Sequence, residues 1–181
     1  MAKAYDLSAD ISFQDAARCV LFAAFRMVQE NSDPTREGLR QKDPTPQGID
    51  ALHDMRVGTR RLRAALSVFG ALFPPEDLAR FERRLGKMTD ALGTVRDCDV
   101  RIETLRRLMD RLPENEAYGI SRLIVRTVKE RNRRRKALLA ALEKWEKERF
   151  ERQFFKALRR HLPECPDAPK PAADIADGEA A

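Results

Sequence analysis

The sequence predicts an all-α protein in which four long helices form an antiparallel bundle and a shorter C-terminal helix packs on it. Ala, Leu, Arg and Glu dominate the 181 residues, whereas Gly occurs only 8 times, and such a composition is typical of helices. Apolar residues recur at intervals of three and four along most of the chain, which is the period of an amphipathic helix. The short breaks at Pro74-Pro75 and Pro113-Glu114 favour neighbouring helices that run antiparallel.

The first helix is expected over residues 13–29, after a flexible N-terminus over residues 1–11. Ser12 directly precedes it, and a serine at that position caps a helix by accepting a hydrogen bond from a free backbone N–H. The segment over residues 31–48 contains three prolines and two glycines, so it is predicted to be a loop with room for one short turn of helix.

The second helix is expected from residue 48 or 49 to Phe73, because Pro74-Pro75 cannot continue it. The third helix starts at Pro75, the fourth covers residues 115–147, and a last amphipathic helix ends near Leu162. These helices form one bundle over residues 12–162, and the Pro-, Ala- and acid-rich segment 163–181 predicts a disordered tail. The third helix carries the most regular heptad of the chain, formed by Leu78, Phe81, Leu85, Met88, Leu92 and Val95.

Cationic side chains form a row on each of the second, third and fourth helices. Those of the second helix step by three, four and three residues from His53 to Arg63, so they share one face. Guanidinium groups one helical turn apart, about 5 Å along the axis, match a ligand that carries a negative charge every few ångströms and can bind its phosphate oxygens in pairs. We expect the three rows to converge on one groove, lined by His53, Arg56, Arg60, Arg61, Arg63, Arg84, Lys87, Arg96, Arg126, Lys129 and Arg133.

Two carboxylates, Asp97 and Asp99, interrupt the apolar pattern of the third helix. They could be a metal pair, but no third ligand is close in sequence, so we expect them to orient arginines of neighbouring helices in a polar layer. Two histidines and three widely spaced cysteines form neither a zinc pattern nor a disulfide framework. The sequence also has no Gly-rich phosphate loop and no nucleophile elbow. Binding is therefore expected rather than catalysis, with no cofactor and no metal site.

The segments that carry these features also resemble a known family. Residues 53–63, His-Asp-Met-Arg-Val-Gly-Thr-Arg-Arg-Leu-Arg, and residues 92–100, Leu-Gly-Thr-Val-Arg-Asp-Cys-Asp-Val, resemble the motifs of the CHAD family, the conserved-histidine α-helical domain. The resemblance covers roughly residues 10–162 and implies a helical bundle that binds inorganic polyphosphate through a basic surface. The family's His and Arg positions correspond to His53, Arg56, Arg60, Arg61 and Arg63, and its Arg-Asp-x-Asp-Val segment corresponds to Arg96, Asp97, Asp99 and Val100.

CHAD domains usually contain two similar helical halves that face each other across a cleft, whereas this sequence has no second His-x-x-Arg-x-x-x-Arg-Arg motif. The resemblance therefore covers one half, and a homodimer would rebuild the cleft from two identical halves. The candidates for the dimer contact are Phe150, Phe154, Phe155 and Leu158, which could equally well close the core of their own bundle.

The predicted function is non-catalytic binding of inorganic polyphosphate. A helical nucleic-acid-binding protein and a structural adaptor for an acidic protein are the alternatives, because phosphate contacts alone do not distinguish polyanions. Proteins that read single-stranded nucleic acid usually combine basic and aromatic residues, and here aromatic residues make up only 7%. No apolar run reaches 18 residues, so no membrane span is expected. We expect a reducing cytoplasm as the location, at polyphosphate granules.

Overall fold

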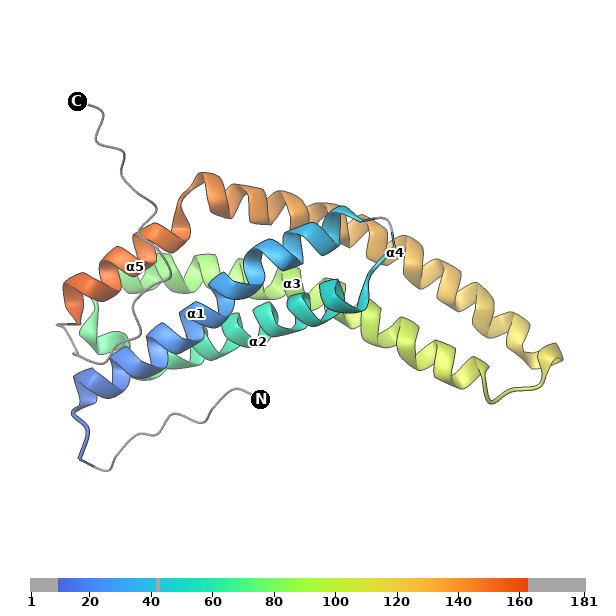
Figure 1. Cartoon of the computed structure of the whole chain (residues 1–181), viewed down its shortest axis with the longest axis horizontal. Helices are drawn as coiled ribbons and strands as arrows, with labels where there is room; N and C mark the ends of the chain where they lie inside the picture. Colours follow the sequence, from blue (N-terminus) through green and yellow to red (C-terminus); the bar gives the residue numbers. More distant parts are fainter. Residues whose placement is uncertain (1–9, 42, 163–181) are drawn as a thin grey trace.

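The computed structural model describes residues 10–41 and 43–162 (Figure 1). Within these residues the structure contains five α-helices, one turn of 3-10 helix and no strand, which confirms the all-α prediction. Residues 1–9 of the predicted flexible N-terminus and the predicted tail over 163–181 lie outside the described residues. The elements are α1 (Phe13–Arg40), α2 (Pro46–Phe69), η1 (Gly70–Leu72), α3 (Pro75–Met109), α4 (Glu114–Lys147) and α5 (Phe150–His161).

The helix starts follow the local chemistry of the sequence. Ser12 caps α1 as predicted, since its Oγ accepts a hydrogen bond of 3.1 Å from the backbone N–H of Asp15. Thr45 caps α2 in the same way through the N–H of Gly48. Pro75 occupies the first turn of α3, where its missing N–H is not needed.

Helix α1 is longer than predicted, because it continues through Pro34 to Arg40. The predicted loop over residues 31–48 is therefore wrong, and residues 41–45 alone separate α1 from α2. Tertiary packing explains the extension: Leu39 is only 2% exposed, and the backbones of α1 and α2 almost touch where Gly38 faces Gly48. Burial of this last stretch outweighs the poor helix propensity of proline.

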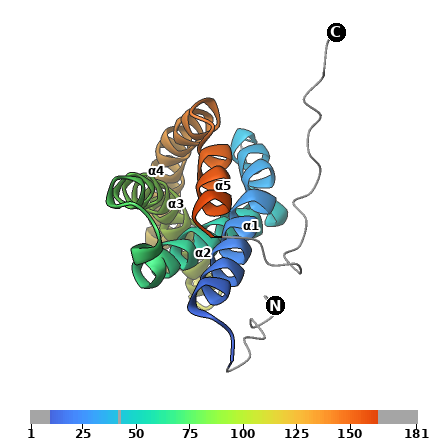
Figure 2. The same ribbon diagram turned by 90° about the vertical axis from the view of Figure 1, so that its left-hand side faces the viewer.

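Successive helices pack in opposite directions around a common core (Figure 2). The start of α1 meets the end of α2, where the rings of Phe13 and Phe69 are 5.0 Å apart. In the end-on view of Figure 2, α2 and α4 occupy opposite corners, with α1 and α3 at the other two. Consistently, α4 packs mainly on α3 and also on α1.

Helix α5 closes one end of the core. The chain bends between α4 and α5 at Arg149, which adopts a left-handed backbone conformation with φ 47°, and α5 continues in the general direction of α4 (Figure 1). Phe150, Phe154 and Leu158 are then fully buried, and Phe155 packs on Phe22 with ring centroids 5.7 Å apart. Phe150, Phe154 and Leu158 close their own core, so the prediction that these three form a dimer contact is wrong. Phe155 is half-buried, and its part in such a contact stays a prediction.

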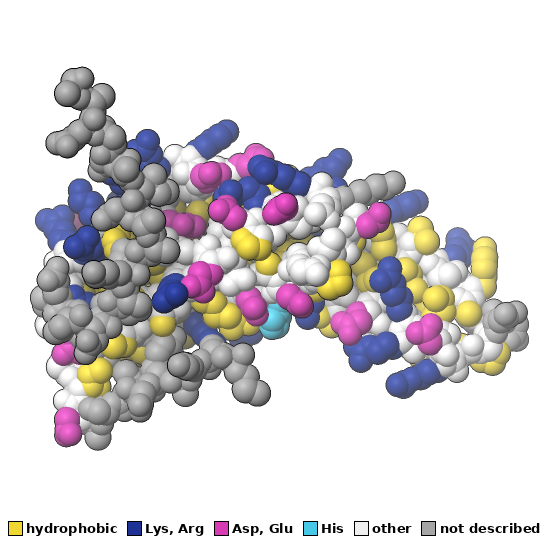
Figure 3. Space-filling view, in the orientation of Figure 1, with side chains coloured by type: hydrophobic (Ala, Val, Ile, Leu, Met, Phe, Trp, Pro, Cys, Tyr) yellow, Lys and Arg dark blue, Asp and Glu magenta, His cyan; other side chains and the backbone are white. Residues whose placement is uncertain are grey.

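The four long helices do not form one bundle along their whole length. Helices α3 and α4 contain 35 and 34 residues, against 28 and 24 in α1 and α2. The α3–α4 hairpin therefore projects beyond the other two helices (Figure 1), and hydrophobic side chains lie between Lys and Arg side chains on this projecting end (Figure 3). In the described part of the chain, no helix is long and apolar enough to span a bilayer. The exposed large apolar residues of the projecting end are Val100, Leu108, Tyr118, Leu123 and Val125.

Candidate functional site

The basic residues of α2 lie on the side of the helix that faces α3. Leu62 and Leu66 turn into the core and are fully buried, whereas Arg60 and Arg63 are exposed and Arg56 is half-buried. The Arg56 Nε lies 3.6 Å from the place where a Cβ on Gly93 of α3 would stand. We call the residues His53, Arg56, Arg60 and Arg63 the α2 row.

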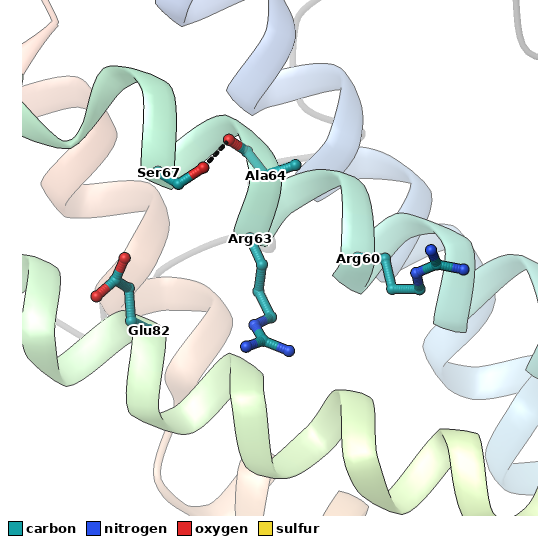
Figure 4. Close-up of a pocket in the computed structure, with 5 residues that line it drawn as sticks. All are labelled: Arg60, Arg63, Ala64, Ser67 and Glu82. Atoms are coloured by element: carbon teal, nitrogen blue, oxygen red, sulfur yellow. Dashed lines mark hydrogen bonds between the residues drawn. The ribbon is translucent and has the colours of Figure 1, made fainter.

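An open pocket of about 440 Å³ lies between α2 and α3 beside the α2 row. Figure 4 shows the side chain of Arg63 reaching from α2 towards α3, while Glu82 points back from α3 towards α2. The two groups form no ion pair within the described structure. The pocket is lined by Arg60, Arg63, Ala64, Ser67 and Glu82.

Two glycines on α3 leave room opposite the α2 row. Because α2 and α3 run antiparallel, the two turns from Arg56 to Arg63 correspond to the two turns from Gly93 back to Gly86. A Cβ on Gly86 would meet no atom within 4 Å, so the groove is open at this level. The same register places Arg96, which is half-buried, level with His53. The groove between α2 and α3 is therefore basic on its α2 side and free of side chains at two positions of its α3 side.

The guanidinium groups of the α2 row make no ion pair and no hydrogen bond with any residue that the structure describes. Other arginines are committed to the fold. Arg18 donates a 3.1 Å hydrogen bond to the carbonyl of Leu162 at the end of α5, and Arg135 donates one of 2.9 Å to the carbonyl of Leu39 near the end of α1. Such carbonyls at a helix end lack partners within the helix. The α2 row thus differs from these arginines in having its hydrogen-bonding capacity unused.

His53 of the α2 row also has a polar atom without a hydrogen-bond partner among the described residues. It is half-buried, and its Nδ1 is a buried atom without a hydrogen-bond partner in the described structure. Imidazole can donate or accept a hydrogen bond at this atom, depending on its tautomer and charge. Because Nδ1 is buried, an anion at the end of the groove can meet only the exposed part of this half-buried ring.

Arg84 and Arg61 are among the predicted members that lie outside this groove. Arg84 turns away from α2 and towards α5, where its Nη2 is 2.7 Å from Glu148 and its guanidinium covers the ring of Phe150. Burial lowers the pKa of this guanidinium, and the Glu148 carboxylate opposes the effect. Arg61 lies on the α1 side of α2, with its Nη1 3.9 Å from the sulfur of Met27.

The cationic row of α4 also fails to reach the groove, so the three rows do not converge as predicted. Arg131 and Leu138 are buried on the inner side of α4, whereas Arg126, Lys129 and Arg133 are exposed. Helical spacing puts these three on the outer side, at the corner opposite α2 (Figure 2). Amphipathic spacing alone could not show which neighbour each row faces.

The remaining predicted residue, Lys87, is exposed on α3 and shares the side of Arg84 rather than that of Gly86 and Gly93.

The two carboxylates of α3 behave differently from each other. Asp99 is buried and forms an ion pair with Arg131 of α4. This confirms the predicted polar layer for Asp99, whereas the prediction is wrong for Asp97, which does not lie inside the bundle. Asp97 is exposed. Between them, Cys98 is 1% exposed, and burial raises the pKa of its thiol. Among the described residues, no group of three or more His, Cys, Asp or Glu side chains could hold a metal ion.

Sequence reasoning missed Glu82, Ser67 and the glycines on the α3 side of the groove. A signal for the glycines was present, because Gly86 and Gly93 are seven residues apart, the same spacing as Arg56 and Arg63. On two antiparallel helices, equal spacing puts the gaps of one helix opposite the cations of the other. The pairing of α2 with α3 had to be known before this signal could be interpreted.

A family model described as the CHAD domain matches residues 20–180. Searches of curated proteins and of solved structures found no match.

Proposed function

Because the chain belongs to the CHAD domain family, which is associated with polyphosphate binding, we propose that it binds inorganic polyphosphate through the α2 row and the groove beside it. The observation that carries this proposal is the unused guanidinium groups of Arg56, Arg60 and Arg63, one helical turn apart on one face. Each can donate two parallel hydrogen bonds to phosphate oxygens. Their rise of about 5 Å per turn suits a linear chain with regularly repeated charge.

The geometry of the groove also supports the proposal. Gly86 leaves open space opposite Arg63, and at Gly93 the neighbouring group is the Arg56 guanidinium itself, so a polyanion beside α3 would meet arginines there. Glu82 limits the groove at one end, because its carboxylate repels phosphate. A ligand therefore enters from the His53 end and extends towards Arg63.

We further propose that binding involves no catalysis. A nucleophile would need an activated hydroxyl or thiol. The Ser67 hydroxyl donates a 2.8 Å hydrogen bond to the carbonyl of Ala64, and the Cys98 thiol is buried with a raised pKa, which disfavours the thiolate. Both features fit a binding module better than a transferase or hydrolase. As part of the same proposal, we place this module in the cytoplasm, at polyphosphate granules.

The test is equilibrium binding of long-chain polyphosphate in competition with single-stranded DNA and with RNA, at low and at physiological salt. The variant R56Q/R60Q/R63Q removes three cations of the α2 row. Charge-assisted hydrogen bonds contribute about 1 kcal/mol each at such exposed positions, so affinity for polyphosphate should fall roughly 100-fold.

A matched control is R26Q/R80Q/R107Q, which removes the same charge from three arginines that pair with acids on their own helices. It should lose far less affinity, because only the long-range field changes. Equal losses in the two variants would place the site elsewhere. Nucleic acid that competes as well as polyphosphate would instead favour the nucleic-acid-binding alternative, and binding only to an acidic protein would favour the adaptor.

A further inference from the structure

The outer side of α4 carries a second set of cations that the groove does not use. They step by four, three, four and three residues, and all five are exposed. At 1.5 Å per residue the set extends over about 21 Å. We call the residues Arg122, Arg126, Lys129, Arg133 and Lys136 the α4 strip.

The charges of the α4 strip are almost entirely uncompensated by the residues that the structure describes. Glu130 is the only acid between residues 117 and 142, and its carboxylate is held 2.6 Å from Arg134 on another side of the helix. Arg133 lies 3.9 Å from the same carboxylate and is 81% exposed. The other four cations form no ion pair within the described residues.

Such a strip is unfavourable for the helix by itself. Like charges three and four residues apart repel each other and destabilise an isolated helix. The same chain avoids this repulsion elsewhere: on the last turns of α4, Lys144 lies 3.7 Å from Glu148. The fold does not need the strip either, because the arginines that connect α4 to its neighbours, such as Arg131 and Arg135, lie on the inner side.

The α4 strip is separate from the α2 row. Helices α2 and α4 occupy opposite corners of the bundle (Figure 2), and α3 lies between them. Lys and Arg side chains stand along the α4 edge of the molecule in Figure 3. A polyanion in the groove beside α2 would have to wrap around α3 to reach Lys129 or Arg133.

We propose that the α4 strip is a second binding site for a linear polyphosphate, so that one chain holds two stretches of polymer on different faces. The choice of polyphosphate rests on the proposed function. Between residues 122 and 136 there is no aromatic side chain on which nucleic-acid bases could stack, and a strip one helix wide suits a polymer that consists of phosphate alone.

The consequence is bivalent binding. Two sites on one chain bridge two polymers, or hold two parts of the same long polymer at a high effective concentration. Long polyphosphate with several chains bound would then form large crosslinked assemblies. A protein with one site would coat the polymer without crosslinking it.

Calorimetric titration with short polyphosphate, of about the length of the strip, counts the sites. The wild-type chain should bind two short polymers. R126Q/K129Q/R133Q should bind one, R56Q/R60Q/R63Q should bind one, and the combined variant should bind none. Circular dichroism should show unchanged helix content in each variant, because all six substituted residues are half-buried or exposed. With long polyphosphate, light scattering should show large assemblies for the wild type and a loss of them in either triple variant.

A single site in the wild type, together with unchanged binding by R126Q/K129Q/R133Q, would overturn the inference and leave the proposed function standing. Loss of all binding in R126Q/K129Q/R133Q alone would overturn the two-site inference and also refute the α2 row as the site of the proposed function, because the α4 strip would then carry all the binding. Binding of RNA but not polyphosphate at the strip would overturn the inference, because the ligand class would be wrong.

Discussion

Breaking the buried ion pair between Asp99 and Arg131 should destabilise the protein much more than breaking a surface pair. The two side chains connect α3 to α4, and the residues are only 6% and 4% exposed. The second carboxylate oxygen of Asp99 is buried without another partner. Each charge therefore depends on the other for compensation.

The magnitude follows from this burial. Removing one partner of a buried pair costs about 3–5 kcal/mol, because an uncompensated charge stays in the interior. For a domain of this size each kcal/mol lowers Tm by about 2–4 °C, so Asp99→Leu or Arg131→Met should each lower Tm by roughly 6–20 °C. The double variant should lose much less than the sum, since two apolar side chains can replace a buried pair at little cost.

Urea unfolding followed by circular dichroism measures all four proteins of this double-mutant cycle. Arg26→Gln provides the control, because Arg26 and Glu30 are 59% and 58% exposed, and it should change stability by less than about 1 kcal/mol. Single variants that lose no more than the control, or losses that simply add in the double variant, would refute the reasoning that the pair is a compensated buried charge.

Three further predictions concern the helix contacts, pH and self-association. Gly38→Ala should destabilise the protein by about 1–3 kcal/mol in urea unfolding, because its Cβ would stand 2.7 Å from the Cα of Gly48. The control Gly119→Ala, whose Cβ would meet no atom within 4 Å, should stabilise the protein by up to about 1 kcal/mol. A Gly38→Ala variant as stable as the wild type would contradict the close packing of α1 and α2. Burial raises the pKa of Glu151, so the folded state retains this proton to a higher pH than the unfolded chain and stability falls as pH rises through that range. The difference in Tm between Glu151→Gln and the wild type should therefore increase in favour of the variant from pH 4 to pH 7. A difference that stays constant over this range would contradict the raised pKa of Glu151. A homodimer that polyphosphate tightens stays a prediction: sedimentation at micromolar concentration should show it, and a monomer with and without polyphosphate would exclude it.

The sequence predicted the helices well where local chemistry decides them. Ser12 marks the start of α1, and Pro75 marks the start of α3. The prediction of a loop was wrong at Pro34. Proline disfavours a helix, but α1 continues through this residue because packing stabilises the segment. The backbone contact between Gly38 and Gly48 joins two segments on either side of the predicted loop, and no pattern within either segment predicts it.

The candidate site was predicted in part for a similar reason. Spacing correctly put Arg56 and Arg63 on one face of α2, since helical periodicity fixes this from the sequence alone. The spacing could not show that Arg84 pairs with Glu148 on the side of α3 away from α2. Glu148 is 64 residues away in sequence, and only the packing of the turn between α4 and α5 brings it close to Arg84. The same spacing on each helix predicts that the cations of that helix share one face. Which neighbour that face meets depends on how the helices pack.

The arginines of this chain therefore form two groups: those that pair with other groups of the protein and those that do not within the described residues. Position in the sequence does not separate the two groups. Arg18, Arg131 and Arg135 compensate carbonyls or a carboxylate inside the fold, and a buried cation without such a partner would be costly. Apart from the 3.9 Å contact of Arg133 with Glu130, the α2 row and the α4 strip are unpaired among the described residues, and exposed ion pairs would have added little stability there. A polyanion can thus bind them while it disturbs at most this one weak contact. Because the two groups do not share partners, substitutions in the rows should alter affinity at nearly constant stability, whereas substitutions of the buried arginines should alter stability first.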